Sequence, residues 1–314
     1  MTDTPKIHAL PFYSEWAGHP IDDLRSIHSI IQAEHPEKPI VYLAGDSSLD
    51  NKAWVPSTGP GGEPLPVPVP DIYNVFLRTP KPKPDVAFWI NHVLEDKATT
   101  LNTAVEASLL RQRDIALLPH DEFIRDHIGP RDVLIVSVGA NDIALSPNAS
   151  TMRHMMQLAW LTPLSSIESG TASSLKYFKH MFGDQTKAYI SRLVAKQKPL
   201  AVIVCMIYYP LEASARAQPS WADTQLKALG YGLYLRQLQA AIKKMYEQAT
   251  RTISIEGTVV IPCPLFEAMD GKTKEDYVAR VEPSVSGGKK MASHLSRIIN
   301  GILSGVAQSS RTDI

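Results

Sequence analysis

Short apolar runs rich in β-branched residues alternate along the chain with longer segments of helical periodicity. The runs predict buried strands at Pro39–Ala44, Thr100–Val105, Asp132–Val138, Ala201–Tyr208 and Thr258–Pro262. Strands that alternate with helices are typical of crossover units, because two parallel neighbours need a long connection between them. The pattern therefore predicts an α/β protein, a three-layer sandwich around a five-stranded, mainly parallel sheet.

The segments between these runs have the spacing of amphipathic helices. The clearest is Leu233–Ala249, where Leu235, Leu238, Ile242 and Met245 recur on one face. The other predicted helices are Ile21–Glu34, Asp85–Glu95, Asp121–His127, Thr186–Lys196 and Ser286–Leu303. No long internal period recurs, which excludes a solenoid or a propeller.

Two segments interrupt the alternation of strands and helices. From Pro56 to Pro84 the many prolines and glycines remove backbone donors and disfavour helical dihedrals, which predicts a long loop. The second segment, residues 146–183, is rich in methionine and aromatic side chains. It predicts either helices that simply cover the sheet or a cap that lines an apolar substrate pocket.

The composition sets the domain count and narrows the classes of partner. The chain has 314 residues, 44% of them hydrophobic, which suits one domain spanning 1–314. Lys plus Arg and Asp plus Glu are both 32, so no net field favours a nucleic acid. We expect no membrane span and no secretory leader, and hence a cytoplasmic protein.

Neither a metal nor an organic cofactor is expected. Cys205 and Cys263 both lie in apolar runs, where a reduced thiol packs as a small apolar side chain. No pair of closely spaced cysteines or histidines has the pattern of a zinc site. No glycine-rich phosphate-binding motif follows a predicted strand.

Residues that could carry chemistry follow two of the predicted strands. Gly45, Asp46 and Ser47 come directly after the first strand, and Gly139 and Asn141 come directly after the third. Parallel strands present their carboxyl ends at one edge, where α/β proteins bind ligands. A serine hydroxyl there can serve as a nucleophile, and an asparagine amide can donate to an oxyanion. The alternative is a turn in which Asp46 or Ser47 only caps the next helix.

Taken in order, these motifs resemble the blocks of the SGNH (GDSL-type) hydrolase family. The first block is Gly45-Asp46-Ser47, and the third is Gly139-Ala140-Asn141-Asp142. The resemblance extends over residues 38–300. The second block matches the stretch from Asn102 to Ser108. The resemblance implies an SGNH or flavodoxin-like sheet, Ser47 as the nucleophile, and an oxyanion site made by Asn141 with the backbone N–H groups of Ser47 and Ala107.

The fourth block departs from the family pattern. The resemblance implies that Glu282 replaces the family's catalytic histidine and that Ala279 replaces the aspartate that orients this histidine. Ala107 stands where the family has a glycine. A carboxylate is normally a weaker base than imidazole, but burial and nearby carboxylates raise its pKa. The nearby carboxylates expected in the crevice are Asp46, Asp50, Glu106 and Asp142.

Three functions are compatible with these residues. The first is a serine esterase, lipase or acyltransferase that uses Glu282 as the base. The second is a non-hydrolytic enzyme, an isomerase or lyase, in which Glu282 moves a proton without an acyl-enzyme. The third is an inactive binding protein on the same scaffold. In each case we expect a small-molecule ligand with an acyl or other apolar part, and the sequence identifies no protein partner.

Four other side chains could take part in catalysis or substrate binding. His294 and His120 could supply an imidazole, although both are more typical of ordinary surface or partly buried histidines. Arg280 and Lys289 could meet an anionic group of a substrate, although solvated surface charge is the simpler expectation.

Overall fold

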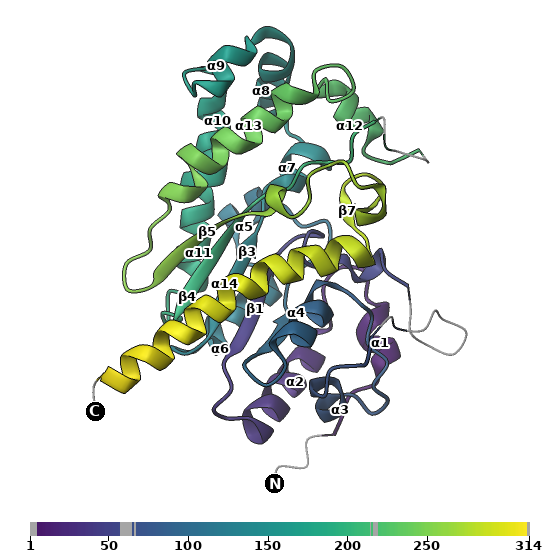
Figure 1. Ribbon diagram of the computed structural model, residues 1–314, viewed down its shortest axis with the longest axis vertical. Coiled ribbons are helices and arrows are strands. Elements are labelled where there is room, and N and C mark those ends of the chain that lie inside the picture. Colours follow the sequence, from purple (N-terminus) through teal and green to yellow (C-terminus); the bar gives the residue numbers. More distant parts are fainter. Residues whose placement is uncertain (1–4, 57–64, 66, 214, 216–218, 313–314) are drawn as a thin grey trace.

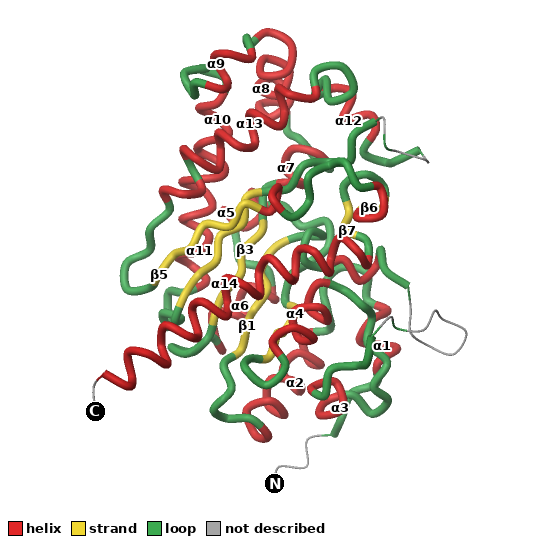
Figure 2. The backbone as a smooth tube through the Cα atoms, in the orientation of Figure 1, coloured by secondary structure: helices red, strands yellow, loops and turns green. Residues whose placement is uncertain are grey.

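A five-stranded parallel sheet forms the centre of the computed structural model, which describes residues 5–56, 65, 67–213, 215 and 219–312 (Figures 1 and 2). The strands lie in the order β2-β1-β3-β4-β5 and confirm the predicted fold class. Their bounds are β1 Ile40–Gly45, β2 Thr99–Asn102, β3 Val133–Ser137, β4 Ala201–Met206 and β5 Val259–Pro264.

The second strand ends three residues before its predicted end at Val105. The side chain of Asn102 accepts a hydrogen bond from the N–H of Ala104 at 3.2 Å. Such a local bond offers the backbone an alternative to the sheet ladder, so the regular strand gives way to a turn, although the N–H groups of Thr103 and Val105 still donate to Leu43 and Gly45 of β1. The turn brings Glu106 and Ala107 beyond the carboxyl end of the sheet.

Helices cover both faces of the sheet. The chain leaves β1 in one direction toward β2 and leaves β3 in the other toward β4, so right-handed crossovers place the connecting helices on opposite faces. On one face α4 (Val86–Leu94) packs along α14 (Val285–Thr312), as Figure 1 shows. On the other face α11 (Thr186–Leu193) packs against α5 (Leu110–Ile115) and α6 (Pro119–His127).

The predicted helices are present with small shifts at their ends. Helix α2 spans Ile21–Glu34 as predicted, and α13 spans Leu235–Gln248. Helix α14 begins at Val285 and extends beyond the predicted end at Leu303. The other elements are α1 Ala9–Ser14, η1 Asn51–Ala53, α3 Ile72–Phe76, α7 Ala140–Ala144, α8 Ala149–Met156, η2 Gln157–Leu161, α9 Leu164–Glu168, α10 Leu175–Lys179, η3 His180–Gln185, α12 Asp223–Ala228, η4 Thr250–Thr252, η5 Leu265–Glu267, η6 Lys274–Asp276, β6 Tyr277–Val278 and β7 Glu282–Pro283.

The proline-rich segment is not a loop throughout, which corrects the prediction for 56–84. Helix α3 forms at Ile72–Phe76, where a stretch without proline lies between Pro70 and Pro80. The carbonyl of Pro70 accepts the N–H of Tyr73 at 3.0 Å and closes the first turn. Residues 57–64 and 66 of this segment lie outside the described part of the chain.

The segment 146–183 is helical and lies beyond the carboxyl ends of the strands, at the top of Figure 1. Helices α8, α9 and α10 and the π-helical stretches η2 and η3 form it. Helix α13 packs against α9 and α10 and holds them over the sheet. The position of this segment makes it a cap over the edge where ligands bind in α/β folds.

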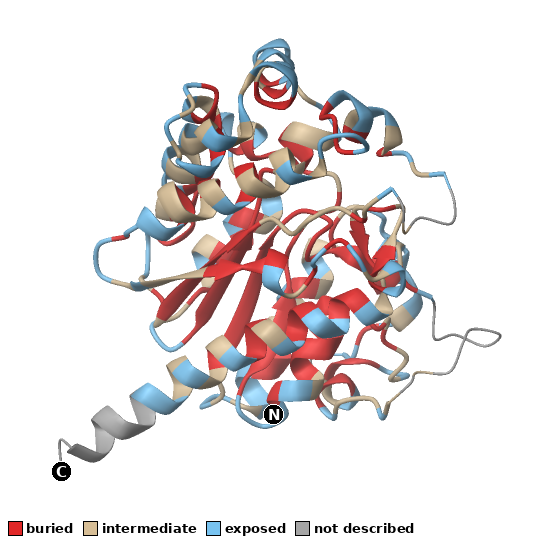
Figure 3. Ribbon diagram, turned by 45° about the horizontal axis from the view of Figure 1, so that its top comes forward, coloured by how far each residue is buried: buried red, intermediate tan, exposed pale blue. Residues whose placement is uncertain are grey.

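The core lies between the sheet and its helices, and Figure 3 shows the strands buried almost throughout. Cys205 and Cys263 are buried in-register neighbours on β4 and β5, packed as the apolar pattern predicted. Among the described residues, none of the helices combines the length and the apolar character needed to cross a bilayer.

Candidate active site

Ser47 lies in a tight turn at the carboxyl end of β1. Gly45 permits this turn because a Cβ there would lie 2.1 Å from the carbonyl oxygen of Ser137 on β3. The Asp46 side chain accepts the N–H of Ser48 at 3.0 Å and its carbonyl accepts the N–H of Asp50 at 2.9 Å. These bonds fix the backbone of Ser47, but neither Asp46 nor Ser47 caps the next helix, because η1 begins after Asp50 and has no side-chain cap.

Glu282 reaches Ser47 from the other end of the chain. It lies on β7, which pairs with β6 as a short antiparallel hairpin just before α14. The backbone of Ala279 and Arg280 is left-handed in the connecting turn, with φ of 47° and 67°. Asn51, four residues after Ser47, donates to the carbonyl oxygen of Pro283 at 3.0 Å. The segment that carries the serine thus also holds the strand that carries the glutamate.

The Ser47 hydroxyl lies beside the Glu282 carboxyl group, close enough to stabilise its charged form. Glu282 is only 2% exposed, and burial raises its pKa to about 7 while the Ser47 hydroxyl opposes this rise. A carboxyl group with this pKa changes its protonation in the range where imidazole normally does. The two residues expected to act together are therefore in contact.

The expected oxyanion donors lie on two further loops. Ala107 has a φ of 58°, the left-handed conformation that glycine adopts most easily, so the alanine is tolerated there at a cost in strain. Within the described residues, the backbone N–H groups of Ser47 and Ala107 make no hydrogen bond. Both donors are therefore available to a ligand.

Asn141 is positioned by the start of α7. Gly139 precedes this helix with a φ of 97°, and a Cβ on it would lie 2.9 Å from the ring of Phe182. The Asn141 amide donates one N–H to the carbonyl oxygen of Ser108 at 3.1 Å, which leaves its second N–H for a ligand. Asp142 is not in the crevice as expected, because its carboxylate accepts the N–H groups of Leu110 and Arg111 at the start of α5.

The Asp46 and Glu106 carboxyl groups lie near Ser47 and Glu282, and both are buried. Burial raises the pKa of Asp46 to about 6 despite hydrogen bonds from Ser48. Burial, followed by the charge of Glu282, raises the pKa of Glu106 to about 9. Asp50 is also fully buried but forms an ion pair with Lys52 at 2.7 Å, so its charge is balanced locally.

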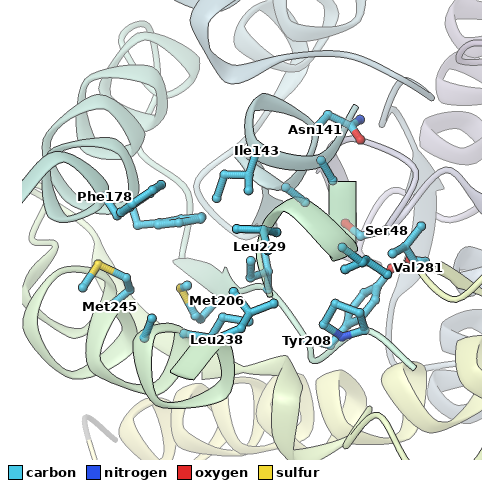
Figure 4. A pocket seen from close by; sticks show the side chains of 18 of the residues that line it. Ser48, Asn141, Ile143, Phe178, Met206, Tyr208, Leu229, Leu238, Met245 and Val281 are labelled. Carbon is cyan, nitrogen blue, oxygen red and sulfur yellow. Dashed lines mark hydrogen bonds between the residues drawn. The ribbon is translucent and has the colours of Figure 1, made fainter. Parts of the chain in front are cut away.

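An apolar pocket of about 100 Å³ opens beside the pair. Asp46, Ser47, Asn141 and Glu282 belong to its lining, while Glu106, Ala107 and Gly139 do not. In Figure 4 their neighbours Ser48 and Val281 lie on the same side of the pocket as Asn141. Phe178 and Met245 lie together at the far end in Figure 4. The remaining walls are formed by apolar side chains of the cap, of β4 and of α12 and α13, among them Leu158, Leu175, Phe182, Met206, Leu229, Leu238 and Ile242.

The cap therefore contributes directly to this pocket. Of the two predictions for residues 146–183, a cap that lines an apolar pocket agrees with the structure. Leu238, Ile242 and Met245, on the apolar face of the predicted helix Leu233–Ala249, line the same pocket. Nothing in the sequence indicates a role for Asn51 or for Tyr208, which lines the pocket and donates its hydroxyl to the carbonyl oxygen of Val281 at 2.5 Å.

The other candidates lie away from Ser47. His120 bonds to the carbonyl oxygen of His19, and the neighbouring Cys263 thiol raises the pKa of His294. Arg280 is buried rather than solvated, because it pairs with Asp223 at 2.8 Å and donates to Leu211. The Lys289 ammonium group lies over the ring of Trp89. No three metal-ligating side chains converge in the described part of the chain.

No family model and no curated protein matches this chain. Several solved structures are similar in shape. A family 3 carbohydrate esterase from Clostridium thermocellum is 12% identical with a TM-score of 0.42, over 86% of this chain and 100% of that one. A carbohydrate acetylesterase from Sinorhizobium meliloti is 13% identical with a TM-score of 0.44, over 84% of this chain and 100% of that one.

An extracellular lipase from Streptomyces rimosus is 10% identical with a TM-score of 0.43, over 84% of this chain and 99% of that one. These identities and scores are low. The likeness therefore assigns neither a family nor an activity to this chain, and the site has to be judged on its own geometry.

The left-handed backbone at Ala107 yields a stability prediction. Ala107→Gly should raise the free energy of unfolding by up to about 1 kcal/mol, because glycine adopts this conformation without the steric cost of a Cβ. Ala104→Gly, in the same loop but without a positive φ, is the control and should destabilise the protein through loss of a buried methyl group. Urea denaturation of both variants measures this. Equal destabilisation by the two changes would contradict the strained conformation of Ala107.

Proposed function

We propose that this protein is a serine hydrolase of the SGNH type that cleaves esters with a short apolar acyl group. The observation that carries the proposal is the approach of the Ser47 hydroxyl to the buried Glu282 carboxyl group at one end of an apolar pocket. A nucleophile, a base with a pKa in the neutral range and an acyl-sized space lie together, which is the arrangement that acyl transfer requires.

In this mechanism Glu282 takes the proton of Ser47 as the serine oxygen attacks the carbonyl carbon of the ester. The oxyanion that forms is stabilised by the Asn141 amide and by the N–H groups of Ser47 and Ala107. The protonated Glu282 then gives its proton to the departing alkoxide, which leaves an acyl-serine and an alcohol. Water repeats the sequence with Glu282 as base and releases the acid.

The raised pKa is what makes a carboxyl group suitable for these steps. A general base works best when its pKa lies near the working pH, because it must both accept and return a proton. With a pKa of about 7 in place of its ordinary value, Glu282 meets this condition. The histidine and aspartate of the family pattern are then replaced by one buried carboxyl group.

The proposal predicts esterase activity that depends on both members of the pair. On p-nitrophenyl esters of increasing acyl length, Ser47→Ala should lower kcat at least about a thousandfold, since the acyl-serine cannot form. Glu282→Gln should lower it by about 10²- to 10⁴-fold, because the proton acceptor is lost. Ser191→Ala, at a half-buried position, and Glu275→Gln, at an exposed one, both lie outside the pocket lining; they are the matched controls and should retain full activity.

Turnover that persists in Ser47→Ala would exclude the acyl-serine and favour proton-transfer chemistry by Glu282. Absence of turnover in the wild type on all esters would remove hydrolysis from consideration.

The pocket volume predicts a preference for short chains. At about 100 Å³ the space is smaller than a cavity of about 150 Å³ that accepts benzene, so acetyl to butanoyl groups fit better than long chains. Ala241→Phe places a ring in this space and should lower kcat/KM for butanoyl esters by at least about tenfold while acetyl esters keep most of theirs. An equal loss on both esters, with unchanged thermal stability, would show that the acyl group lies elsewhere.

A further inference from the structure

Glu106 has no role in the steps above, yet it is held firmly beside them. It is 5% exposed and directly precedes Ala107. Its Oε1 accepts the indole N–H of Trp54 at 3.3 Å, and its own N–H donates to Asp50 at 2.9 Å. Its Oε2 is buried without a hydrogen-bond partner in the described part of the chain. A buried carboxylate oxygen without a donor is costly, so this arrangement needs a physical reason.

Glu282 shows the same feature. The Ser47 hydroxyl lies beside its carboxyl group, whereas Oε2 is buried and has no partner among the described residues. The N–H of Glu106 bonds to Asp50, and the next residue, Asn51, bonds to the carbonyl oxygen of Pro283, so the segments that carry Glu106 and Glu282 meet at the same loop. Each of the two carboxyl groups carries one unsatisfied oxygen, and after burial the charge of Glu282 is the largest influence that raises the pKa of Glu106.

The surrounding charges disfavour a second negative charge on this pair. Asp50 and Asp46 also raise the pKa of Glu106, and only the indole of Trp54 opposes them. The nearby cation Lys52 is already bound to Asp50. Two carboxyl groups in such an environment hold one proton between them at neutral pH, and the proton stays on the group that is harder to ionise.

We propose that Glu106 is a positioning residue that remains uncharged and acts through Glu282. The proton on its free oxygen is donated to the free oxygen of Glu282, directly or through one water. This bond satisfies both buried oxygens, favours the ionised form of Glu282 and orients the carboxylate toward Ser47. The role in catalysis rests on the proposed function, whereas the sharing of one proton by the pair does not.

Glutamine is the informative substitution, because its amide is permanently neutral and still donates a hydrogen bond. Glu106→Gln should keep kcat within about threefold of wild type. Wild-type turnover should fall above about pH 9, where Glu106 ionises and loses its donor, and Glu106→Gln should lack this decline. Glu106→Leu should lower kcat at least tenfold and move the acid limb of the pH profile to higher pH, because ionised Glu282 loses its donor.

A purely structural role would make the glutamine and leucine variants lose activity alike without moving either limb. That result, with both variants folded by circular dichroism, would overturn the proposal.

The pair can also be measured without turnover, by ¹³C NMR of the protein labelled at glutamate Cδ. One resonance should titrate near pH 9, disappear in Glu106→Gln, and titrate at lower pH in Glu282→Gln, because the neighbouring charge is removed. If these shifts occur but no ester is hydrolysed, the proposed function fails and the shared proton stands. A Glu106 resonance that titrates near the ordinary value of about 4.3 would contradict the claim that Glu106 and Glu282 share one proton.

Discussion

The approach of the Ser47 hydroxyl to the buried Glu282 carboxyl group is the contact on which this site depends. It requires a carboxyl group to be buried beside a hydroxyl, and burial is unfavourable for the charged form. The fold meets this requirement by bringing the hairpin before α14 against the turn after β1, with Asn51 bonded to the carbonyl of Pro283. Movement of either segment would let water reach Glu282 and return its pKa toward that of an ordinary glutamate.

The three loops at the carboxyl ends of β1, β2 and β3 are joined by buried polar side chains. Asp50, with its charge balanced by Lys52, accepts the N–H of Glu106. Asp142 accepts the N–H of Leu110, and Arg113 donates to the carbonyl oxygen of Gly45. These bonds set the distances between the proposed nucleophile and the proposed oxyanion donors before any substrate arrives. Preorganisation of this kind is the largest source of catalysis in many enzymes.

The sheet and most helices could be predicted from the sequence because burial imposes a simple periodicity. Helix α2 was predicted to the residue, and Ser47 was found because its turn follows a fully apolar strand. Helix α3 was missed because the surrounding prolines dominated the local pattern. The partners of the site could not be predicted: Trp54, Asn51 and Tyr208 act through contacts with residues far along the chain, and no local spacing records such contacts.

The central claim is that Ser47 is a nucleophile activated by Glu282, and covalent labelling tests it without knowledge of the substrate. A fluorophosphonate forms a bond to an activated serine oxygen and releases fluoride, and intact mass with peptide mapping locates the adduct. We expect a single adduct on Ser47, formed at a rate that rises with pH through about 7 and falls strongly in Glu282→Gln. Labelling at other serines, or labelling of Ser47 at equal rates in wild type and Glu282→Gln, would contradict the account.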